Sequence, residues 1–186
     1  MRLSRRNRHI VVAADFFDQD HAVVWFVRRG QSGEPVDEFW NLGRDSDGWI
    51  VLGGGGGSPG ADLETRPDLG AVTERNKSLG FDAACPFGFV GGGGSGFQGQ
   101  PPYIHMQLAQ EVVELRFSDR EPQRVAEHGY TVLMYPARDR PTISAFDSDG
   151  QCLGTFIPER WDRPWWDTLR GWLTIRRGRS SWTNQS

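Results

Sequence analysis

The chain has 186 residues, of which 37% are hydrophobic, enough for one ordinary domain with a buried core or for two small ones. Its formal net charge of -3 argues against a dedicated nucleic-acid-binding protein, which usually carries a basic domain. No stretch reaches the roughly 18 apolar residues of a membrane span and no secretory signal is recognisable, so the sequence predicts a soluble, cytoplasmic protein.

The chain begins with four arginines within residues 1–8, which we expect to form a flexible basic arm. Strands are predicted at His9–Ala14 and His21–Arg28. The second contains a continuous apolar run rather than an alternating one, which indicates a strand that is either buried on both faces or central in the sheet. Val36–Leu42 and Trp49–Leu52 flank a turn, so the sequence predicts a three-stranded meander over residues 22–52.

The tetrapeptide Asp-Ser-Asp-Gly occurs twice, at Asp45–Gly48 and Asp147–Gly150. Closely spaced carboxylates before a glycine also open calcium-binding EF-hand loops, but such a loop needs a glutamate at its twelfth position. Gly56 and Pro158 stand there instead, and neither can supply that ligand. Both copies are therefore interpreted as hairpin turns, and we expect neither a metal ion nor a cofactor.

Two glycine-rich stretches occupy residues 53–60 and 91–102. Neither has the sequence of a phosphate-binding loop, so they are predicted to be flexible loops. A second interpretation is that the glycines allow close backbone approach to a ligand, with Phe97 as an aromatic contact. Between them, residues 65–79 have weak helical character, and Phe81–Val90, interrupted by Pro86, is predicted to be an edge strand or a packed loop.

Short strands separated by turn signals continue from residue 103 to residue 157. Their spacing of about 8–12 residues is typical of an antiparallel β-sandwich or small barrel. The expected strands are Tyr103–Ala109, Val112–Ser118, Gln123–Ala126, Tyr130–Tyr135, Thr142–Phe146 and Gln151–Ile157, with residues 137–140 turning the fourth strand into the fifth.

The stretch VVELRFSDREPQRV, followed by HGYTVLMYPARDRPTISAFDSDGQCLG, resembles a module of actinobacterial proteins. In that module a V-E-L-R-F-x-D-G-R-x-V strand pair precedes a hairpin of the form P-x-x-V-x-A-x-D-x-D-G-x-x-L. The resemblance covers residues 112–154 and implies an uncharacterised immunoglobulin-like β-sandwich without catalytic residues. Arg120-Glu121 stands where the module has Gly-Arg, so we expect a different geometry in the first turn.

The C-terminal region is rich in tryptophan and arginine. Apolar residues recur there at the spacing of one helical face, which predicts an amphipathic helix over residues 161–179 and a tail over residues 180–186. The helix could dock on the sheet, lie at a membrane surface through its tryptophans and arginines, or bind a partner. The residues of this face are Trp161, Trp165, Trp166, Leu169, Trp172 and Leu173.

Little in the sequence indicates catalysis. The four histidines show no metal-ligand spacing, Ser95 is not in a nucleophile elbow, and Cys85 and Cys152 are expected to be free, buried thiols. We therefore predict one β-sandwich domain over residues 9–160 that binds a protein partner without catalysis. The alternatives are a peripheral membrane-surface protein and an enzyme of unknown class. The candidate binding residues are Trp161, Trp165, Trp166, Trp172 and Phe97; no catalytic residue is assigned, and the oligomeric state does not follow from the sequence.

Overall fold

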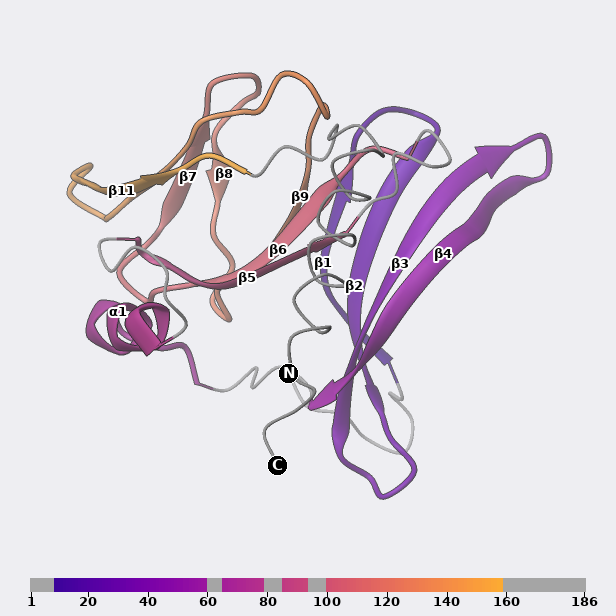
Figure 1. Ribbon diagram of the computed structural model, residues 1–186, viewed down its shortest axis with the longest axis horizontal. Coiled ribbons are helices and arrows are strands. Elements are labelled where there is room, and N and C mark those ends of the chain that lie inside the picture. Colours follow the sequence, from indigo (N-terminus) through magenta and orange to yellow (C-terminus); the bar gives the residue numbers. More distant parts are fainter. Residues whose placement is uncertain (1–8, 60–64, 79–84, 94–99, 159–186) are drawn as a thin grey trace, which may run out of the picture.

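The computed structural model describes residues 9–59, 65–78, 85–93 and 100–158. These ranges form eleven strands and one helix, and all strand pairs are antiparallel (Figure 1). The mainly β, antiparallel fold predicted from the sequence is therefore confirmed. The elements are β1 (His9–Phe16), β2 (His21–Arg29), β3 (Pro35–Asp45), β4 (Gly48–Pro59), α1 (Leu69–Ser78), β5 (Phe87–Gly93), β6 (Tyr103–Leu108), β7 (Glu114–Phe117), β8 (Gln123–Arg124), β9 (Tyr130–Met134), β10 (Ile143–Phe146) and β11 (Cys152–Phe156).

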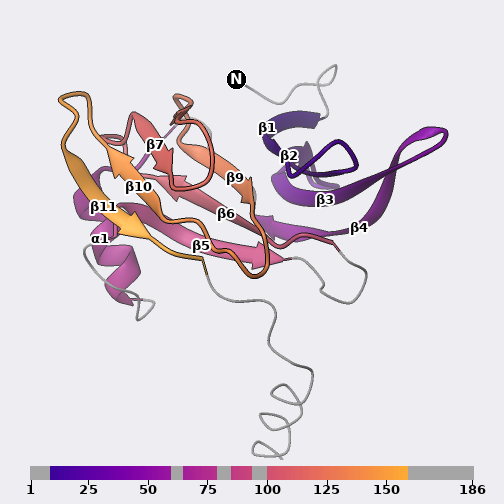
Figure 2. The same ribbon diagram turned by 90° about the horizontal axis from the view of Figure 1, so that it is seen from above.

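The described strands form three sheets, with the orders β1-β2-β3-β4, β5-β6-β9 and β11-β10-β7-β8. The three-stranded sheet lies between the other two (Figure 2). Alternate residues of β6 and β9 point to opposite faces, and both faces are buried. Ile104 and Leu133 enter one hydrophobic core, whereas Tyr103 and Val132 enter another. The middle sheet thus joins two cores.

The larger core lies between the middle sheet and the C-terminal sheet. Helix α1 contributes Val72 to this core, and β5 contributes Phe87 beside it. Asn76, also on α1, is buried and donates hydrogen bonds to the carbonyls of Cys85 and Phe87, which ties the helix to the start of β5. The remaining buried members are Ile104, Met106, Leu108, Ala109, Val112, Leu115, Leu133, Tyr135, Ile143 and Ala145.

An aromatic cluster fills the space between the N-terminal sheet and the middle sheet. The Trp25 ring lies 4.9 Å from Phe39 and 4.8 Å from Tyr130, and His105 lies 4.2 Å from Phe39. Burial lowers the pKa of His105 to about 4 and raises the pKa of Tyr103. His105 is therefore neutral near pH 7 and packs as an aromatic ring.

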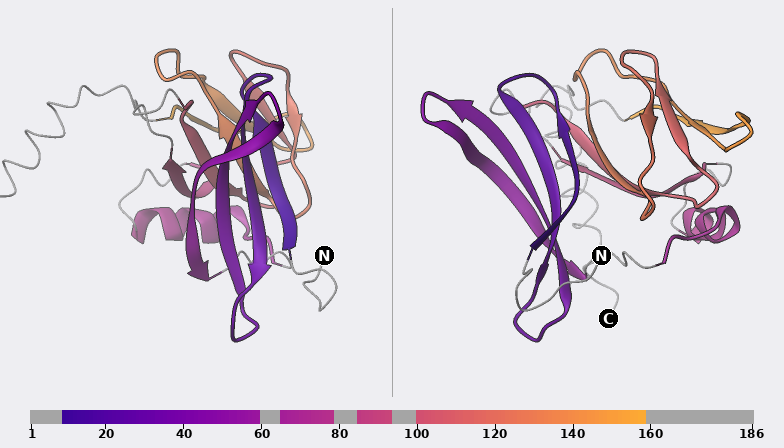
Figure 3. Two further views of the ribbon diagram at one scale, coloured as in Figure 1. Left: turned by 90° about the vertical axis from the view of Figure 1, so that its right-hand side faces the viewer. Right: turned by 180° about the vertical axis from the view of Figure 1, so that it is seen from behind.

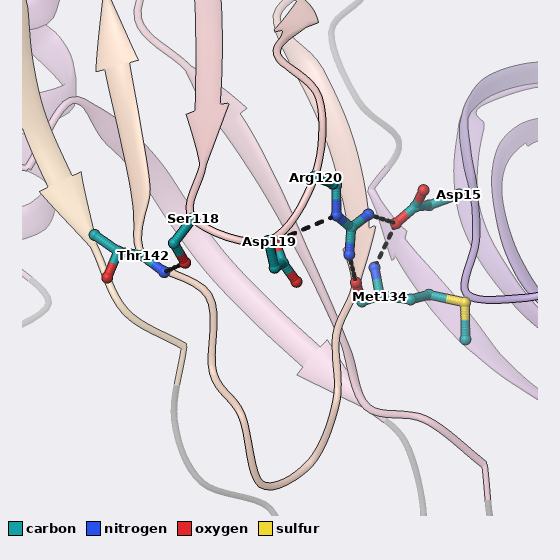
Figure 4. A network of polar contacts seen from close by, with 6 residues as sticks. All are labelled: Asp15, Ser118, Asp119, Arg120, Met134 and Thr142. Atoms are coloured by element: carbon teal, nitrogen blue, oxygen red, sulfur yellow. Dashed lines mark hydrogen bonds and ion pairs between the residues drawn. The ribbon is translucent and has the colours of Figure 1, made fainter.

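A polar contact also joins the two sheets (Figure 4). Asp15, in β1, accepts hydrogen bonds from the Met134 backbone N–H at 2.7 Å and from the Arg120 guanidinium at 2.9 Å. Arg120 in turn donates to the Met134 carbonyl. Met134 is at the free edge of β9, so one ion pair satisfies both of its outward backbone groups. We call these three residues the clasp.

The N-terminal sheet is a strongly twisted meander whose β3–β4 hairpin projects away from the rest of the molecule (Figure 3). Strand β2 is central, and Val23, Trp25 and Phe26 are all buried, as its continuous apolar run predicted. The meander has four strands rather than the three expected, because β1 pairs with β2.

The first glycine-rich stretch is not a loop, and the prediction that it would be one is wrong. Strand β4 continues to Pro59, and Gly53, Gly54 and Gly55 pair with successive residues of β3. Glycine keeps both backbone hydrogen-bonding groups, and here a neighbouring ring takes the space of the missing side chain. A Cβ atom at Gly54 would lie 3.0 Å from Trp40 Cδ1. Residues 91–93 of the second stretch likewise belong to β5.

Strand β9 does not pair with β10, although the sequence predicted a turn between them. It pairs with β6, while β10 pairs with β7 and β11. The alternation of side chains identifies these strands but carries no information about their partners. Both Asp-Ser-Asp-Gly turns are confirmed, since Asp45 and Asp147 each accept two backbone hydrogen bonds within the turn.

The expectation that both cysteines would be buried is wrong, because Cys85 is half-buried and Cys152 is exposed. No helix in the described part of the chain is both long enough and apolar enough to cross a membrane. The predicted basic arm at residues 1–8 and the predicted C-terminal helix and tail lie outside the described residues.

Candidate docking surface

One side of the N-terminal sheet faces the middle sheet, and the other, which we call the outer face, is turned away from it. Residues that pair directly across antiparallel strands share a face. The pairs of Val24 with Trp40 and of Phe26 with Val11 therefore place these four side chains on the outer face. The apolar members of the outer face are Val11, Phe16, Val24, Phe26, Trp40, Leu42, Trp49 and Val51.

The outer face is apolar and open to solvent. Val11, Phe16 and Val51 have exposed fractions of 63%, 61% and 54%, and Trp40 and Trp49 have 42% and 43%. An antiparallel sheet with one solvated side ordinarily carries polar residues on that side. Five large apolar side chains gathered on one face are typical of an interaction site rather than of scattered surface residues.

Ring contacts hold the aromatic side chains of the outer face in place. The Trp40 ring meets Phe26 edge-on at 4.8 Å, and the Phe16 ring meets Trp49 edge-on at 5.9 Å. The Trp40 ring also lies over Gly54 of β4. Because these rings are held before any ligand arrives, binding would cost little additional side-chain entropy.

Charge on the outer face is unevenly distributed. Towards the β2–β3 turn, Arg28 and Glu38 form an ion pair, so their charges offset each other. The end of the sheet that holds the β1–β2 and β3–β4 turns carries four carboxylates and the guanidinium of Arg44. This end of the N-terminal sheet is therefore acidic. Its carboxylates belong to Asp18, Asp20, Asp45 and Asp47.

The acidic end is structurally ordered. Asp18 accepts hydrogen bonds from the backbone N–H groups of Asp20 and His21 and contacts the His21 ring at 3.0 Å. Slight burial raises the pKa of Asp18, but these hydrogen bonds and the neighbouring imidazole outweigh it, so the pKa lies below its ordinary value. Asp18 is thus ionised at neutral pH.

A hollow lies beside the C-terminal sheet, where the loops after β7 and β9 meet. It places the carboxylates of Asp119 and Asp139 near Arg138 and Arg140. Both carboxylates are exposed, and the hollow contains neither a histidine nor a cysteine. Across the described residues, no group of three or more histidine, cysteine, aspartate or glutamate side chains is placed to hold a metal ion.

No family model, no curated protein and no solved structure matches this chain. The function must therefore be argued from the chain itself.

The binding residues predicted from the sequence lie outside the described residues: Trp161, Trp165, Trp166, Trp172 and Phe97. The outer face was not predicted from the sequence. Trp40 and Trp49 were assigned to strands, and a strand tryptophan is ordinarily a core residue. One feature of the sequence does indicate an aromatic residue on the outer face: Phe39 and Trp40 are adjacent in a strand, so one must lie on each face of β3.

Proposed function

We propose that the protein is a non-catalytic protein-binding module whose outer face binds a basic, tryptophan-bearing amphipathic segment. The chain's own residues 159–186, from the same or a neighbouring copy, are such a segment. The observation that carries this proposal is the exposure of Phe16, Trp40 and Trp49 on the outer face, where Trp49 packs against Phe16 and Trp40 packs against the buried Phe26.

Charge supports this choice of ligand. Residues 9–158 contain 21 of the 24 acidic residues but only 11 of the 21 lysines and arginines, a net charge of -10. Residues 159–186 contain six arginines and three carboxylates, a net charge of +3. The acidic end of the N-terminal sheet would attract the arginines of the segment, while the tryptophans of the segment would cover the exposed rings of the outer face.

The proposal includes two finer structural points. Residues 161–179 form an amphipathic helix whose tryptophan face is the binding face, which the spacing of the tryptophans supports. Residues 112–154 belong to an immunoglobulin-like module, which supplies the scaffold and no activity. The order β11-β10-β7-β8 of the C-terminal sheet is compatible with a sandwich half, and the larger core lies beneath it.

Hydroxyl-radical footprinting of the full chain tests this function, because it reports the solvent access of individual side chains. We expect Trp40 and Trp49, which are both exposed in the structure, to be protected in the wild-type chain. Replacing Trp165, Trp166 and Trp172 with serine should raise their modification rates several-fold. The matched control is Trp182→Ser, a tryptophan of the same segment outside the predicted helix, which should change nothing.

Equal modification of Trp40 in the wild-type and the triple variant would refute the proposal. Sedimentation of both proteins with anionic phospholipid vesicles separates the membrane alternative. If the triple substitution abolished vesicle binding and left the footprint of the outer face unchanged, the C-terminal segment would be a membrane anchor instead.

A further inference from the structure

We propose that the C-terminal segment, residues 159–186, binds the outer face of a second copy of the chain and not the outer face of its own copy. Two copies then exchange their segments and form a closed dimer. The exchange rests on the proposed function, because it specifies which copy supplies the segment that covers the outer face. It follows from the place at which the described chain ends.

The segment leaves the molecule from the C-terminal sheet. The described chain ends at Pro158, which follows β11 and is buried. Arg140, in the connection between β9 and β10, donates a hydrogen bond to the Pro158 carbonyl at 3.1 Å. Strand β11 itself pairs with β10. The start of the segment is therefore fixed beside this sheet.

The outer face lies on the opposite side of the molecule. Figure 1 shows the N-terminal sheet and β11 on either side of the middle sheet, and in the left view of Figure 3 the N-terminal sheet lies in front of the C-terminal sheet. Packed sheets lie about 10 Å apart, so about 20 Å separates the C-terminal sheet from the N-terminal sheet. The side chains of the outer face lie farther away still.

The tether before the predicted helix is too short to cover this distance. Only two residues, 159 and 160, separate Pro158 from Trp161, the first residue of that helix. Three Cα-to-Cα steps of extended chain span at most about 11 Å, so Trp161 of the same copy cannot reach the outer face. A helix over residues 161–179 is a rigid rod of about 28 Å, and it cannot lay its tryptophan face along the outer face while its first turn stays near Pro158.

A second copy removes this restriction. Each segment crosses to the outer face of the partner, and a reciprocal exchange about a two-fold axis closes the assembly with both outer faces covered. Charge favours the exchange as well. Residues 9–158 of two copies, each with a net charge of -10, repel each other, whereas each exchanged segment, with a net charge of +3, places positive charge between them.

A linker inserted between Pro158 and Glu159 tests the exchange in the full chain. A Gly-Ser linker of about 20 residues has a root-mean-square span of about 25 Å, which lets the segment reach the outer face of its own copy. The effective concentration of the segment within one chain is then about millimolar, above the working concentration of the protein. The matched control carries the same linker after Ser186, where it adds mass but no reach.

Sedimentation equilibrium measures the oligomeric state, and hydroxyl-radical footprinting measures the solvent access of Trp40. We expect the wild-type protein and the control to be dimers at about 100 μM, with a dissociation constant in the micromolar range. Dilution to about 0.1 μM, well below that constant, should dissociate them and raise the modification rate of Trp40 several-fold. The variant with the inserted linker should be monomeric at both concentrations, with Trp40 protected at both.

A monomeric wild-type protein whose Trp40 stays protected at every concentration would overturn the exchange and leave the proposed function standing. The exchange would also be overturned if the inserted linker left the dimer as strong as in the control, because the tether would then not decide which copy is bound. Equal modification of Trp40 in the wild-type protein and in the triple tryptophan-to-serine variant at about 100 μM, far above the expected dissociation constant, would instead refute the proposed function itself.

Discussion

The clasp gives a quantitative prediction for how the N-terminal sheet is held on the middle sheet. Replacing Asp15 with alanine removes the acceptor of the Met134 N–H and the nearer counter-charge of Arg120, whose Nε also lies 3.7 Å from Asp119 Oδ1. The side chains of Arg120 and Asp15 are only 27% and 19% exposed, so water replaces the lost contacts poorly. An unsatisfied buried donor costs about 1–3 kcal/mol, and loss of one partner of a buried ion pair costs about 3–5 kcal/mol. Because this pair is partly exposed, we expect a loss of about 2–4 kcal/mol.

Equilibrium unfolding in urea, followed by tryptophan fluorescence, measures this loss. The matched control is Glu114→Ala, which breaks the ion pair with Arg116, whose two side chains are 36% and 51% exposed. Exposed pairs contribute under about 1 kcal/mol. A double-mutant cycle of Asp15→Ala with Arg120→Ala should give a coupling energy of about 1–3 kcal/mol. If Asp15→Ala cost no more than Glu114→Ala, the clasp would not hold the sheets together.

Two further predictions concern the buried ring of His105 and two glycines with positive φ. The folded-state pKa of His105 is about 4 against 6.5 in the unfolded chain, so the unfolded state binds more protons between these values and stability falls as the pH falls through this window. The loss in the free energy of unfolding reaches about 3 kcal/mol at pH 4 and is absent above pH 6.5. His105→Phe should remove this pH dependence, measured by urea unfolding at several pH values. An unchanged pH dependence would contradict the burial of the His105 ring. Gly129 and Gly150 both have positive φ, +73° and +78°. A Cβ at Gly129 would lie 2.5 Å from Arg66 Nε and 2.8 Å from the Leu108 carbonyl oxygen, whereas a Cβ at Gly150 would meet nothing within 4 Å. By thermal unfolding, Gly150→Ala should cost about 1 kcal/mol and Gly129→Ala clearly more; equal costs would mean that Arg66 and Leu108 do not approach Gly129 this closely.

Local features of the fold could be predicted from the sequence. The continuous apolar run of β2 indicated a central strand, and Asp45 and Asp147 indicated turns; both predictions depend only on neighbouring residues. The pairing of strands could not be predicted in this way. Strand β9 has the same alternation whether it pairs with β6 or with β10, and its choice depends on long-range packing of Val132 and Leu133 into two different cores.

The glycine run of β4 was misassigned for a related reason. Low complexity usually indicates a flexible connection, but Gly54 becomes a strand residue because the Trp40 ring lies over it. That contact comes from the adjacent strand and is invisible in the local sequence. The outer face was missed because apolar residues on both sides of a strand predict burial on both sides, whereas Trp40 on the outer side of β3 is 42% exposed.

Photo-crosslinking tests the central claim most directly. The full chain would carry p-benzoylphenylalanine in place of Trp166, and the crosslinked peptides would be mapped by mass spectrometry before and after dilution. The account predicts crosslinks to the outer face, at or beside Phe16, Trp40 and Trp49, with loss on dilution if the segment comes from a neighbouring copy. Crosslinks confined to the C-terminal sheet, or none to protein, would contradict it.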